Sequence, residues 1–597
     1  MKILQQVGLV IYLAAFGLFL SLFFVSDFRL TEEMATEAIE NESLRRHFNE
    51  NASFMMEQVY DGKFAFVSDL HQAFKAVNSR IAEDLAITNS ELEKIVSTTA
   101  GSEPATFSLE DASAQLGGTD ETLPVKQKML SDYGGWLEGR SFATEDELRS
   151  NLRQTVDNIN RDVVRQQGFN KYETKRYTSV FARMAAIGLV VEHTTLFFFL
   201  TFVLASLGGL LYNLPKLALT KPGIQNDGIF FSSMKNRGWL GIATGTFLIL
   251  FYIALYFYPE YMTSWIILAD PLSQMLNGGL ASEFFLYGFI YTLCIFVMGI
   301  RMIIKYRHSR YHIIRTLSVM FFQTSFAFLI PEVLVRLNYP YYDFKNIWPL
   351  DYDFFFSSSL NQLIESGTLG MFMLVWGIIL IIIAVPVFVF FFGKRWYCSW
   401  VCGCGGLAET LGDPYRQLSD KSLSAWKIER WMVHSVLVFA VVMTAGVLYT
   451  FFTGAGTILG INTYSISEWY GFAIGAVFAG VVGTGFYPFM GNRVWCRFGC
   501  PLAAYLGIVQ RFRSRFRITT NGGQCISCGN CSTYCEMGID VRWYAQRGQN
   551  IVRASCVGCG VCASVCPRGV LKLENGDHTD RFNTPILIGN DSVRISE

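Results

Sequence analysis

Eight cysteines near the C-terminus have the residue type and spacing of iron-sulfur ligands. Two runs repeat the pattern C-x2-C-x2-C-x3-C, in which three thiolates reach three iron corners of a 4Fe-4S cluster from one tight loop and the fourth cysteine ligates the other cluster. The predicted ligands of the first cluster are Cys525, Cys528, Cys531 and Cys566. The predicted ligands of the second are Cys556, Cys559, Cys562 and Cys535. This crossing makes the two runs one domain.

The residue after each run also bears on the chemistry. Pro567 follows the last cysteine of the second run, as is common in this pattern, whereas Glu536 takes that place in the first run. A carboxylate there is expected to lower the potential of the nearby cluster, because negative charge disfavours reduction. Zinc is the alternative for C-x2-C pairs, but two complete runs in tandem are hard to explain with tetrahedral zinc sites.

Five further cysteines come directly after two apolar segments, in the sequences Trp-Tyr-Cys-Ser-Trp-Val-Cys-Gly-Cys and Trp-Cys-Arg-Phe-Gly-Cys-Pro. They are Cys398, Cys402, Cys404, Cys496 and Cys500. Residues four apart share one face of a helix, so each Cys-x3-Cys pair is expected to present two sulfurs toward a common point. Soft sulfur ligands suit iron, an iron-sulfur centre or cuprous copper, which predicts a third metal site. Structural buried cysteines and a reversible dithiol are the alternatives.

The composition indicates the environment of these sites. Of the 597 residues, 51% are hydrophobic and only 16% are charged, which is typical of an integral membrane protein in contact with lipid. The net charge of zero gives no indication of a nucleic-acid partner. Apolar runs of about 20 residues predict eight transmembrane helices. Their ranges are 6–26, 193–213, 238–257, 283–303, 316–336, 369–393, 431–452 and 469–490.

Lysine and arginine predict the orientation of these helices. One set of loops is rich in basic residues, for example Arg301 and Lys305 or Lys394 and Arg395, and the other set is nearly bare. Basic loops face the cytoplasm. We therefore expect a bacterial inner (cytoplasmic) membrane protein whose N-terminus and cluster-binding domain are cytoplasmic and whose segment 27–192 is periplasmic.

The predicted fold is a mostly α-helical membrane protein with an extracytoplasmic helical domain and a C-terminal bacterial-type two-cluster ferredoxin domain of the α+β class. The predicted parts are a transmembrane anchor, the extracytoplasmic domain, transmembrane helices 2–6, a cytoplasmic cysteine loop, transmembrane helices 7–8, a cytoplasmic CxxxCP segment, the ferredoxin domain and a tail. Their ranges are 1–26, 27–192, 193–393, 394–430, 431–490, 491–515, 516–580 and 581–597.

Apolar residues in the segment 27–192 recur at spacings of three and four, which predicts helices packed on an apolar core. Two such stripes are Phe64, Phe66, Leu70, Phe74 and Val77, and Leu148, Leu152, Val156, Ile159 and Val163. Aromatic residues also crowd the loop 337–367, which favours a membrane-interface belt, with a quinone or partner dock as the alternative.

Within the membrane, the sequence favours quinone over haem as a mobile carrier. The histidines nearest the spans, His193, His308, His312 and His434, lie near span ends, which disfavours axial ligation of a b-type haem. Glu332 with Arg336 is the best candidate pair of ionisable residues for a quinone site, and a pair anchored at the span end is the alternative.

The arrangement of spans, two Cys-x3-Cys motifs and a terminal ferredoxin resembles the NosR/NapH family of membrane-bound polyferredoxins. The large segment between the first two spans is most similar to NosR. The resemblance implies electron transfer between quinone or a cytoplasmic donor and a periplasmic metalloenzyme, with Cys398, Cys402, Cys496 and Cys500 in the paired motifs. Gly403 stands where the family has proline, and residues 27–192 lack the Ser-Gly-Ala-Thr type sequence on which NosR proteins carry covalent FMN.

The CcoG-type accessory proteins of cytochrome oxidase assembly are a more distant resemblance, and they are linked to copper reduction. The leading hypothesis is therefore an electron carrier that passes electrons from two 4Fe-4S clusters through the five-cysteine site to quinone or a redox partner protein. One alternative is a copper-reducing or assembly factor for a respiratory metalloenzyme. Another is a redox sensor whose outer domain signals to a partner. No substrate chemistry is evident, so the sequence does not decide whether the protein is an enzyme.

Overall fold

The computed structural model describes residues 2–100, 106–224, 236–454, 457–458, 461–521, 524–575, 587–588 and 593–594. The chain forms two compact units. The larger comprises Met1–Phe19, Thr195–Tyr258 and Leu268–Glu597, and the smaller comprises Leu20–Thr194 and Pro259–Ile267. Most of the predicted tail, 581–597, lies outside the described residues.

Among the described residues, eight helices are long and apolar enough to cross a membrane, which confirms the predicted number of spans. Three are continuous α-helices that match predicted spans closely: α1 (Lys2–Leu22), α13 (Trp239–Phe257) and α16 (Glu283–Lys305). The helix α24 (Leu423–Thr453) begins eight residues before the predicted span because Ser422 caps it, its side chain accepting from the Ala425 amide.

The other four spans each contain a π-helical stretch. The symbol η marks these stretches and also the short 3-10 helices elsewhere in the chain. The elements of the four spans are α11 (Thr194–Phe198), η3 (Phe199–Val203) and α12 (Leu204–Leu219); α17 (Arg310–Phe321), η5 (Phe322–Leu329) and α18 (Ile330–Arg336); α20 (Gly367–Ile379), η6 (Leu380–Ala384) and α21 (Val385–Phe392); and α25 (Thr463–Tyr470), η8 (Gly471–Val482) and α26 (Gly483–Gly485).

The smaller unit is mainly helical, as its apolar stripes predicted. Phe66, Leu70, Phe74 and Val77 are buried, whereas Phe64 is exposed. All five residues of the second stripe are buried. The unit also contains the small sheet β2-β1-β3 and the segment Pro259–Ile267, which the sequence had not assigned to it.

The elements of this unit are β1 (Asp27–Arg29), α2 (Glu32–Ala38), α3 (Glu42–Asn51), η1 (Ser53–Met55), β2 (Val59–Asp61), α4 (Lys63–Leu85), α5 (Asn89–Ala100), α6 (Leu109–Ala114), α7 (Thr122–Gly134), η2 (Gly135–Leu137), α8 (Glu145–Gln167), α9 (Lys171–Met184), β3 (Ala186–Ile187), α10 (Leu189–Glu192), η4 (Pro259–Met262) and α14 (Thr263–Ile267).

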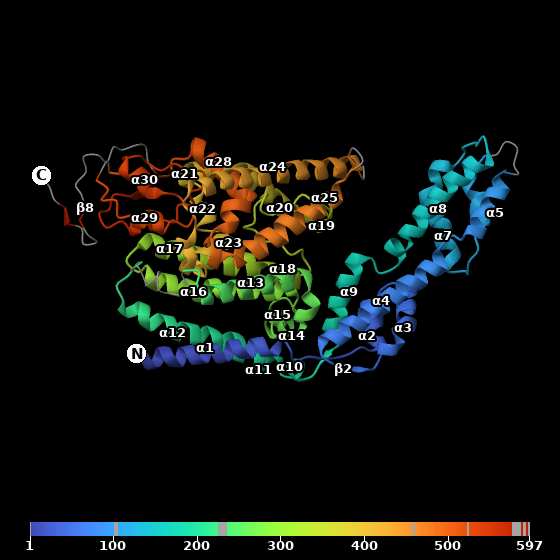
Figure 1. Ribbon diagram of the computed structural model, residues 1–597, viewed down its shortest axis with the longest axis horizontal. Helices are drawn as coiled ribbons and strands as arrows, with labels where there is room; N and C mark the ends of the chain where they lie inside the picture. Colours follow the sequence, from blue (N-terminus) through green and yellow to red (C-terminus); the bar gives the residue numbers. More distant parts are fainter. Residues whose placement is uncertain are drawn as a thin grey trace. The chain divides into compact units, whose positions relative to one another are not determined.

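Short elements of the larger unit connect its spans and carry the cysteines. They are α15 (Asp270–Leu276), α19 (Ser357–Glu365), α22 (Arg395–Cys398), α23 (Gly403–Thr410), η7 (Asp413–Leu418), β4 (Thr457–Ile458), β5 (Ile461–Asn462), α27 (Tyr487–Met490), η9 (Trp495–Gly499) and α28 (Pro501–Arg513). In Figure 1, α22 and α28 lie at the end of the helices to which the C-terminal region is attached.

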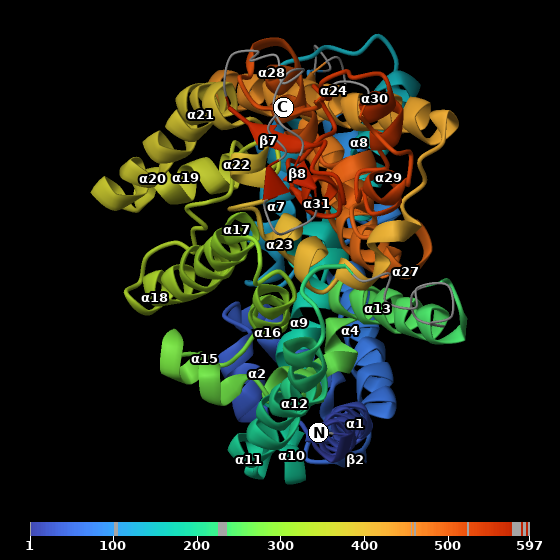
Figure 2. The same ribbon diagram turned by 90° about the vertical axis from the view of Figure 1, so that its left-hand side faces the viewer.

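The C-terminal domain contains β6 (Arg517–Thr519), α29 (Asn530–Thr533), α30 (Val541–Gln546), α31 (Val561–Ser564) and β7 (Lys572–Glu574). The antiparallel pair β6–β7 places Arg517 opposite Glu574 and so joins the beginning of the domain to its end. Figure 2 views the larger unit from this end, with α29 and α31 in front of the helices. The last described strands are β8 (Leu587–Ile588) and β9 (Val593–Arg594).

The middle of the aromatic loop, which was expected to form an interface belt, packs into the larger unit. Ile347 shares a buried cluster with Cys398 and Trp495, and the Tyr397 hydroxyl donates to the Lys345 carbonyl over 3.0 Å. The Trp348 indole donates to Thr444 on α24. These contacts bury the middle of the loop against the second cysteine set, although Tyr339 and Tyr341 remain exposed.

Candidate iron-sulfur sites

The four cysteines predicted to hold the first cluster line one cavity, together with Pro567 and several apolar side chains. Cys566 comes from the second run, so the structure contains the crossing that the spacing predicted. Burial, together with the neighbouring Cys566 and Cys525, raises the pKa of the Cys531 thiol to about 12. Four sulfurs at one point suit a metal cluster, because bound iron removes the cost of ionising closely spaced thiols.

The second group converges in the same way. Burial raises the pKa of the Cys562 thiol, and Cys559, Cys556 and Cys535 raise it further because they lie close by. The two loops repeat one backbone conformation. Gly529 and Gly560 have φ values of 80° and 83° and precede the short helices α29 and α31. Glycine adopts this left-handed conformation without strain, which lets each loop wrap tightly.

The loop between Cys556 and Cys559 is bound directly to the segments that join the membrane helices. Ser399 donates to the Val557 carbonyl over 2.7 Å, and Tyr311 donates to the Gly558 carbonyl over 2.6 Å. Cys528, a predicted ligand of the first cluster, is exposed. The second cluster site therefore lies toward the membrane helices and the first toward solvent.

The five cysteines of the second set, Cys398, Cys402, Cys404, Cys496 and Cys500, line another cavity, whose walls come from segments distant in the sequence. Cys398 and Cys402 are contributed by the segment after α21, and Cys496 and Cys500 by the segment after α26. Leu350, from the aromatic loop, forms part of the same wall. Tertiary structure thus unites the two motifs, as the sequence predicted, and Cys398, Cys402, Cys496 and Cys500 are each 5–7% exposed.

The two Cys-x3-Cys motifs have matching geometry, but neither is a continuous α-helix as expected. The Cys402 amide donates to the Tyr397 carbonyl over 2.8 Å, and the Cys500 amide donates to the Trp495 carbonyl over 2.9 Å. Each motif is therefore a wide turn, after which the second cysteine caps a new helix, α23 or α28. Backbone amides at these helix starts point toward sulfur, as from Ala503 to Cys500 over 3.4 Å.

Lys394 connects the second cluster site to the five-cysteine site. Its side chain is buried, and its ammonium donates to the Ala554 carbonyl over 3.1 Å. Burial raises the pKa of the Cys398 thiol to about 12, while the Lys394 charge opposes that rise. Burial likewise raises the pKa of Cys556 to about 11, again against the Lys394 charge. One cation therefore lies close enough to stabilise negative charge at both sites.

Beside the second cluster site, the helices enclose a network of buried ion pairs. The Glu409 carboxylate accepts from Arg315 at 2.7 Å, from Arg493 at 2.9 Å and from Arg416 at 3.1 Å. Arg315 also donates to the Cys559 carbonyl. Five cations face three carboxylates in this connected set, which consists of Arg301, Lys305, Arg315, Arg416, Arg493, Glu409, Asp413 and Glu536. The positive surplus favours reduction of a cluster held by thiolates.

Glu536 belongs to this network, which changes the effect expected of it. Its side chain is fully buried and accepts from Arg416 at 2.9 Å, and its second oxygen lies 3.1 Å from Arg493. Burial raises the pKa of Glu536. Burial also tends to raise the pKa of Glu409, but the charges of Arg315, Arg416 and Arg493 outweigh that effect and hold its pKa well below the usual range. Of the two carboxyl groups, Glu536 therefore has the greater affinity for a proton. The sequence-based expectation of added negative charge is thus not supported by the structure.

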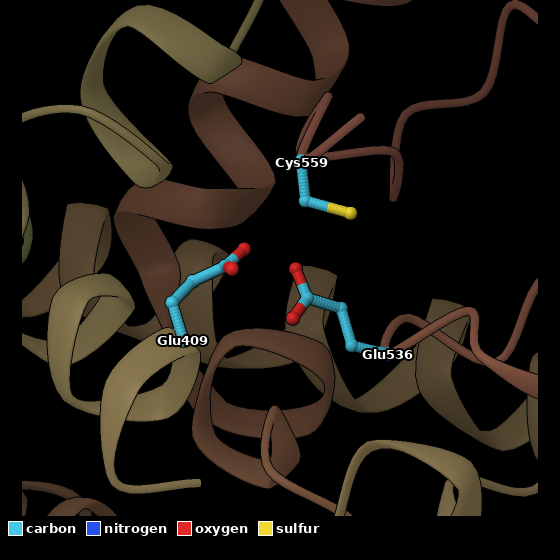
Figure 3. Close-up of side chains that lie close together, drawn as sticks. All are labelled: Glu409, Glu536 and Cys559. Carbon is cyan, nitrogen blue, oxygen red and sulfur yellow. The ribbon is translucent and has the colours of Figure 1, made fainter. Parts of the chain in front are cut away.

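Figure 3 shows Glu409 and Glu536 pointing toward each other beneath Cys559. One ligand atom from each lies within 4.8 Å of the others. We interpret this as a carboxyl pair beside a cluster ligand, not as a separate metal site. The guanidinium groups already neutralise the carboxyl pair, and a second cation would be repelled by them.

The sequence did not predict this network: Glu536 was expected only to add negative charge, and Arg301 and Lys305 served only to orient the helices. Each charged residue of the network is a single residue in a largely apolar stretch, and the available signal was the number of charged residues near the cysteine motifs.

The two residues of the predicted quinone pair, Glu332 and Arg336, each bond to the region of α15. Glu332 accepts from the side chain of Asn277, the residue that follows α15, over 2.7 Å. Arg336 donates to the carbonyl of Met275 in α15 over 2.7 Å.

Comparisons with known proteins agree with this arrangement. A family model described as a 4Fe-4S dicluster domain matches residues 524–571. A second model, described as a 4Fe-4S binding domain, matches twice, at 374–422 and 470–519, and each match contains one Cys-x3-Cys motif. These matches and the apolar helices support a membrane-spanning iron-sulfur protein with electron-transport features.

The chain is also 26% identical, over 156 residues, to YccM of Escherichia coli (strain K12), which is named as a candidate electron transport protein. The matched part is 25% of this chain and 43% of YccM, so the match spans less than half the length of this relative. No solved structure matches the chain.

The residues present fit the iron-sulfur clusters that these models imply. The first ferredoxin site offers four thiols around one cavity, and the five-cysteine cavity is walled by thiols and apolar or aromatic side chains. The second ferredoxin site brings four thiols close together, and the carboxylates beside it, Glu409 and Glu536, are already paired with arginines. Thiolate ligands with nearby backbone amides are the environment in which 4Fe-4S clusters are held. When bound, such clusters supply one-electron transfer, and the protein positions and charges their surroundings.

Proposed function

We propose that this protein is a membrane-bound electron carrier. Electrons pass between two ferredoxin clusters and a third iron-sulfur centre on the five-cysteine site, and from there to a quinone or a redox partner protein. The observation that supports this order is the direct bond between the two loops. Ser399, the residue after Cys398, donates to Val557, the residue after Cys556.

The three sites then form a series. The first cluster lies nearest solvent, where a soluble donor or acceptor can approach Cys528. The second cluster lies between it and the helices, and Lys394 lies between the second cluster and the third. A buried cation there stabilises the electron as it moves between two anionic centres.

Four of the five cysteines suffice for a third 4Fe-4S cluster. The two matching turns present Cys398, Cys402, Cys496 and Cys500 symmetrically, and each repeat of the 4Fe-4S family model contains two of them. Cys404 follows outside this symmetry. We therefore assign the four as ligands and Cys404 as a wall residue of the site.

The distribution of basic loops supports a cytoplasmic ferredoxin domain in a bacterial inner membrane, with the smaller unit in the periplasm. In that orientation the aromatic loop approaches the five-cysteine site from the periplasmic side, since Leu350 contributes to its wall. The protein then suits delivery of electrons to, or collection from, a periplasmic metalloenzyme.

Iron analysis and electron paramagnetic resonance of the anaerobically purified protein test this proposal. Three clusters correspond to about twelve irons per chain and two clusters to about eight. We expect the double variant Cys398→Ser/Cys496→Ser to lose about four irons and one resonance signal. Cys404→Ser and Cys294→Ser, a cysteine outside all three sites, should retain the wild-type content. About eight irons in both wild type and double variant would contradict the third cluster.

Copper handling is a second candidate, and one observation favours it. Cys402 and Cys404 are hydrogen-bonded to each other, and this bond lowers the pKa of the Cys402 thiol to about 6. A pre-ionised thiol beside a second sulfur suits cuprous copper. Two results together would support copper handling over a third cluster. The wild-type protein would contain copper with only about eight irons, and Cys404→Ser would lose the copper.

A further inference from the structure

A second cavity adjoins the five-cysteine site, among the membrane helices α13, α16 and η8. Tyr256, Tyr287, Tyr291 and Tyr487 line it, and Cys404, Trp495 and Cys496 form the wall that it shares with the five-cysteine cavity. Its volume is about 60 Å³, compared with about 20 Å³ at the first cluster site and about 10 Å³ among the five cysteines. The cavity is therefore the roomiest of the three.

Two buried polar atoms at this cavity lack partners within the described structure. Trp495 is 7% exposed and its indole Nε1, a donor, has no hydrogen bond. Asn492 is 1% exposed and its side-chain oxygen, an acceptor, also has none. Both residues line the cavity. An unsatisfied buried donor or acceptor destabilises the folded protein, so a ligand that pairs with both atoms would be bound favourably.

The walls indicate the chemistry of that ligand. Tyrosine rings follow one another along α16, with the centroids of Tyr287 and Tyr291 5.5 Å apart, and they offer faces for a planar ring. The orphaned donor suits a carbonyl, and the orphaned acceptor suits a hydroxyl. A planar ring that carries a carbonyl when oxidised and a hydroxyl when reduced has both, and its position among membrane helices suits a lipid-soluble molecule.

We propose that this tyrosine-lined cavity binds the head group of a membrane quinone, which exchanges electrons with the centre on the five-cysteine site through the wall formed by Cys404 and Cys496. The inference rests on the proposed function and names its membrane acceptor or donor. It differs from the two quinone locations that the sequence indicated, the aromatic loop 337–367 and the pair Glu332 and Arg336.

The reaction balances as a two-electron, two-proton exchange. A quinone takes two electrons, delivered one at a time by reduced iron-sulfur centres, and two protons, so both carbonyl groups become hydroxyl groups. In the opposite direction the quinol gives up the same electrons and protons. Trp495 donates to a carbonyl of the oxidised form, and Asn492 accepts from a hydroxyl of the reduced form.

One residue of the cavity wall allows the site to be blocked without replacing a cysteine. Ala479 lines the cavity on η8, so Ala479→Leu places a larger side chain in it. Ala473 is on the same helix but is exposed, so Ala473→Leu is the matched control for an added leucine. Trp495→Phe keeps an aromatic ring and removes only the donor.

Binding of ubiquinone-1 to the full-length protein, measured by titration calorimetry, tests the proposal, with iron content and resonance spectra recorded for every variant. We expect Ala479→Leu to abolish binding, Trp495→Phe to weaken it about 2- to 10-fold, and Ala473→Leu to leave it unchanged. Iron content should be the same in all four proteins.

Equal ubiquinone-1 binding by all four proteins, or no binding by wild type with its clusters intact, would overturn the quinone site. The latter result would identify the cavity as a water pocket that satisfies Trp495 and Asn492. Cavity-dependent binding in a protein with only about eight irons would support the quinone site and contradict the third cluster, so the two proposals fail separately.

Discussion

The buried carboxyl pair Glu409 and Glu536 makes a sharp prediction, because the pKa values of the two neighbouring side chains shift in opposite directions. Three guanidinium groups hold Glu409 in its ionised form, and we expect Glu536 to hold the proton of the pair. Glutamine resembles a protonated glutamic acid, because its amide can donate where the carboxylic acid did. We therefore expect Glu536→Gln to be tolerated and Glu409→Gln to be strongly destabilising.

The magnitude follows from what each change leaves behind. Glu409→Gln leaves Arg315, Arg416 and Arg493 without their shared anion, and removal of one partner from a buried ion pair costs about 3–5 kcal/mol. Glu536→Gln preserves the donor to Glu409, so we expect a loss of about 1 kcal/mol or less. The change at Glu409 also weakens attachment of the second cluster, since Arg315 holds the Cys559 carbonyl.

Urea titration in detergent, followed through the visible absorbance of the clusters, measures this difference. With an m-value of about 2–3 kcal/mol/M, a loss of 3–5 kcal/mol lowers the midpoint by about 1–2.5 M. Glu536→Gln should shift it by less than about 0.5 M. Equal shifts in the two variants would refute the assignment of the proton to Glu536, and a small shift for Glu409→Gln would refute the anchoring role of the network.

Three further perturbations test other parts of the structure. Gly405→Ala should remove iron from the five-cysteine site, because the added carbon would lie 2.0 Å from the Cys398 carbonyl oxygen. The control Gly446→Ala should retain the iron, because the nearest atom to its added carbon lies 3.7 Å away. Metal analysis of the two variants measures the difference. Lys394→Met should lower the potentials of the second and third centres by tens of millivolts, measured by redox titration, and unchanged potentials would contradict its placement between them. Burial lowers the pKa of Lys63 from the usual 10.5 to about 7 in the folded protein. Between these pH values the unfolded state binds a proton that the folded state has lost, so the smaller unit should gain stability as pH rises from about 7 to 10.5. Above that pH, Lys63 is neutral in both the folded and the unfolded state. Circular dichroism melting of the full chain should lose this dependence in Lys63→Met.

The features predicted well from sequence are those that short stretches of chain encode. Ligand spacing within each ferredoxin run is local, because one loop must reach three irons, and the structure places Cys525, Cys528, Cys531 and Cys566 around one cavity. The eight spans are also local, since each requires about 20 apolar residues whatever its neighbours. The apolar stripe along α8 is a third example.

Local patterns misled where tertiary contacts decide conformation. The Cys-x3-Cys spacing suggested one helical face, but in each motif a wide turn follows and a new helix begins at the second cysteine. Aromatic residues in the loop 337–367 predicted a membrane-interface belt, but composition alone does not show that the middle of the loop packs against the second cysteine set. The buried position of Ile347 against Cys398 required the whole fold.

By itself, the sequence determined that the chain crosses a membrane and carries two cluster motifs, because hydrophobic length and ligand spacing are properties of contiguous residues. Only the tertiary structure decided that Cys398 and Cys496 line one cavity, that Glu536 is buried against Arg416 and Arg493, and that a tyrosine-lined cavity lies beside Cys404. These features depend on contacts between segments about a hundred residues apart. The charge, burial and partners of a side chain exist only once such segments meet.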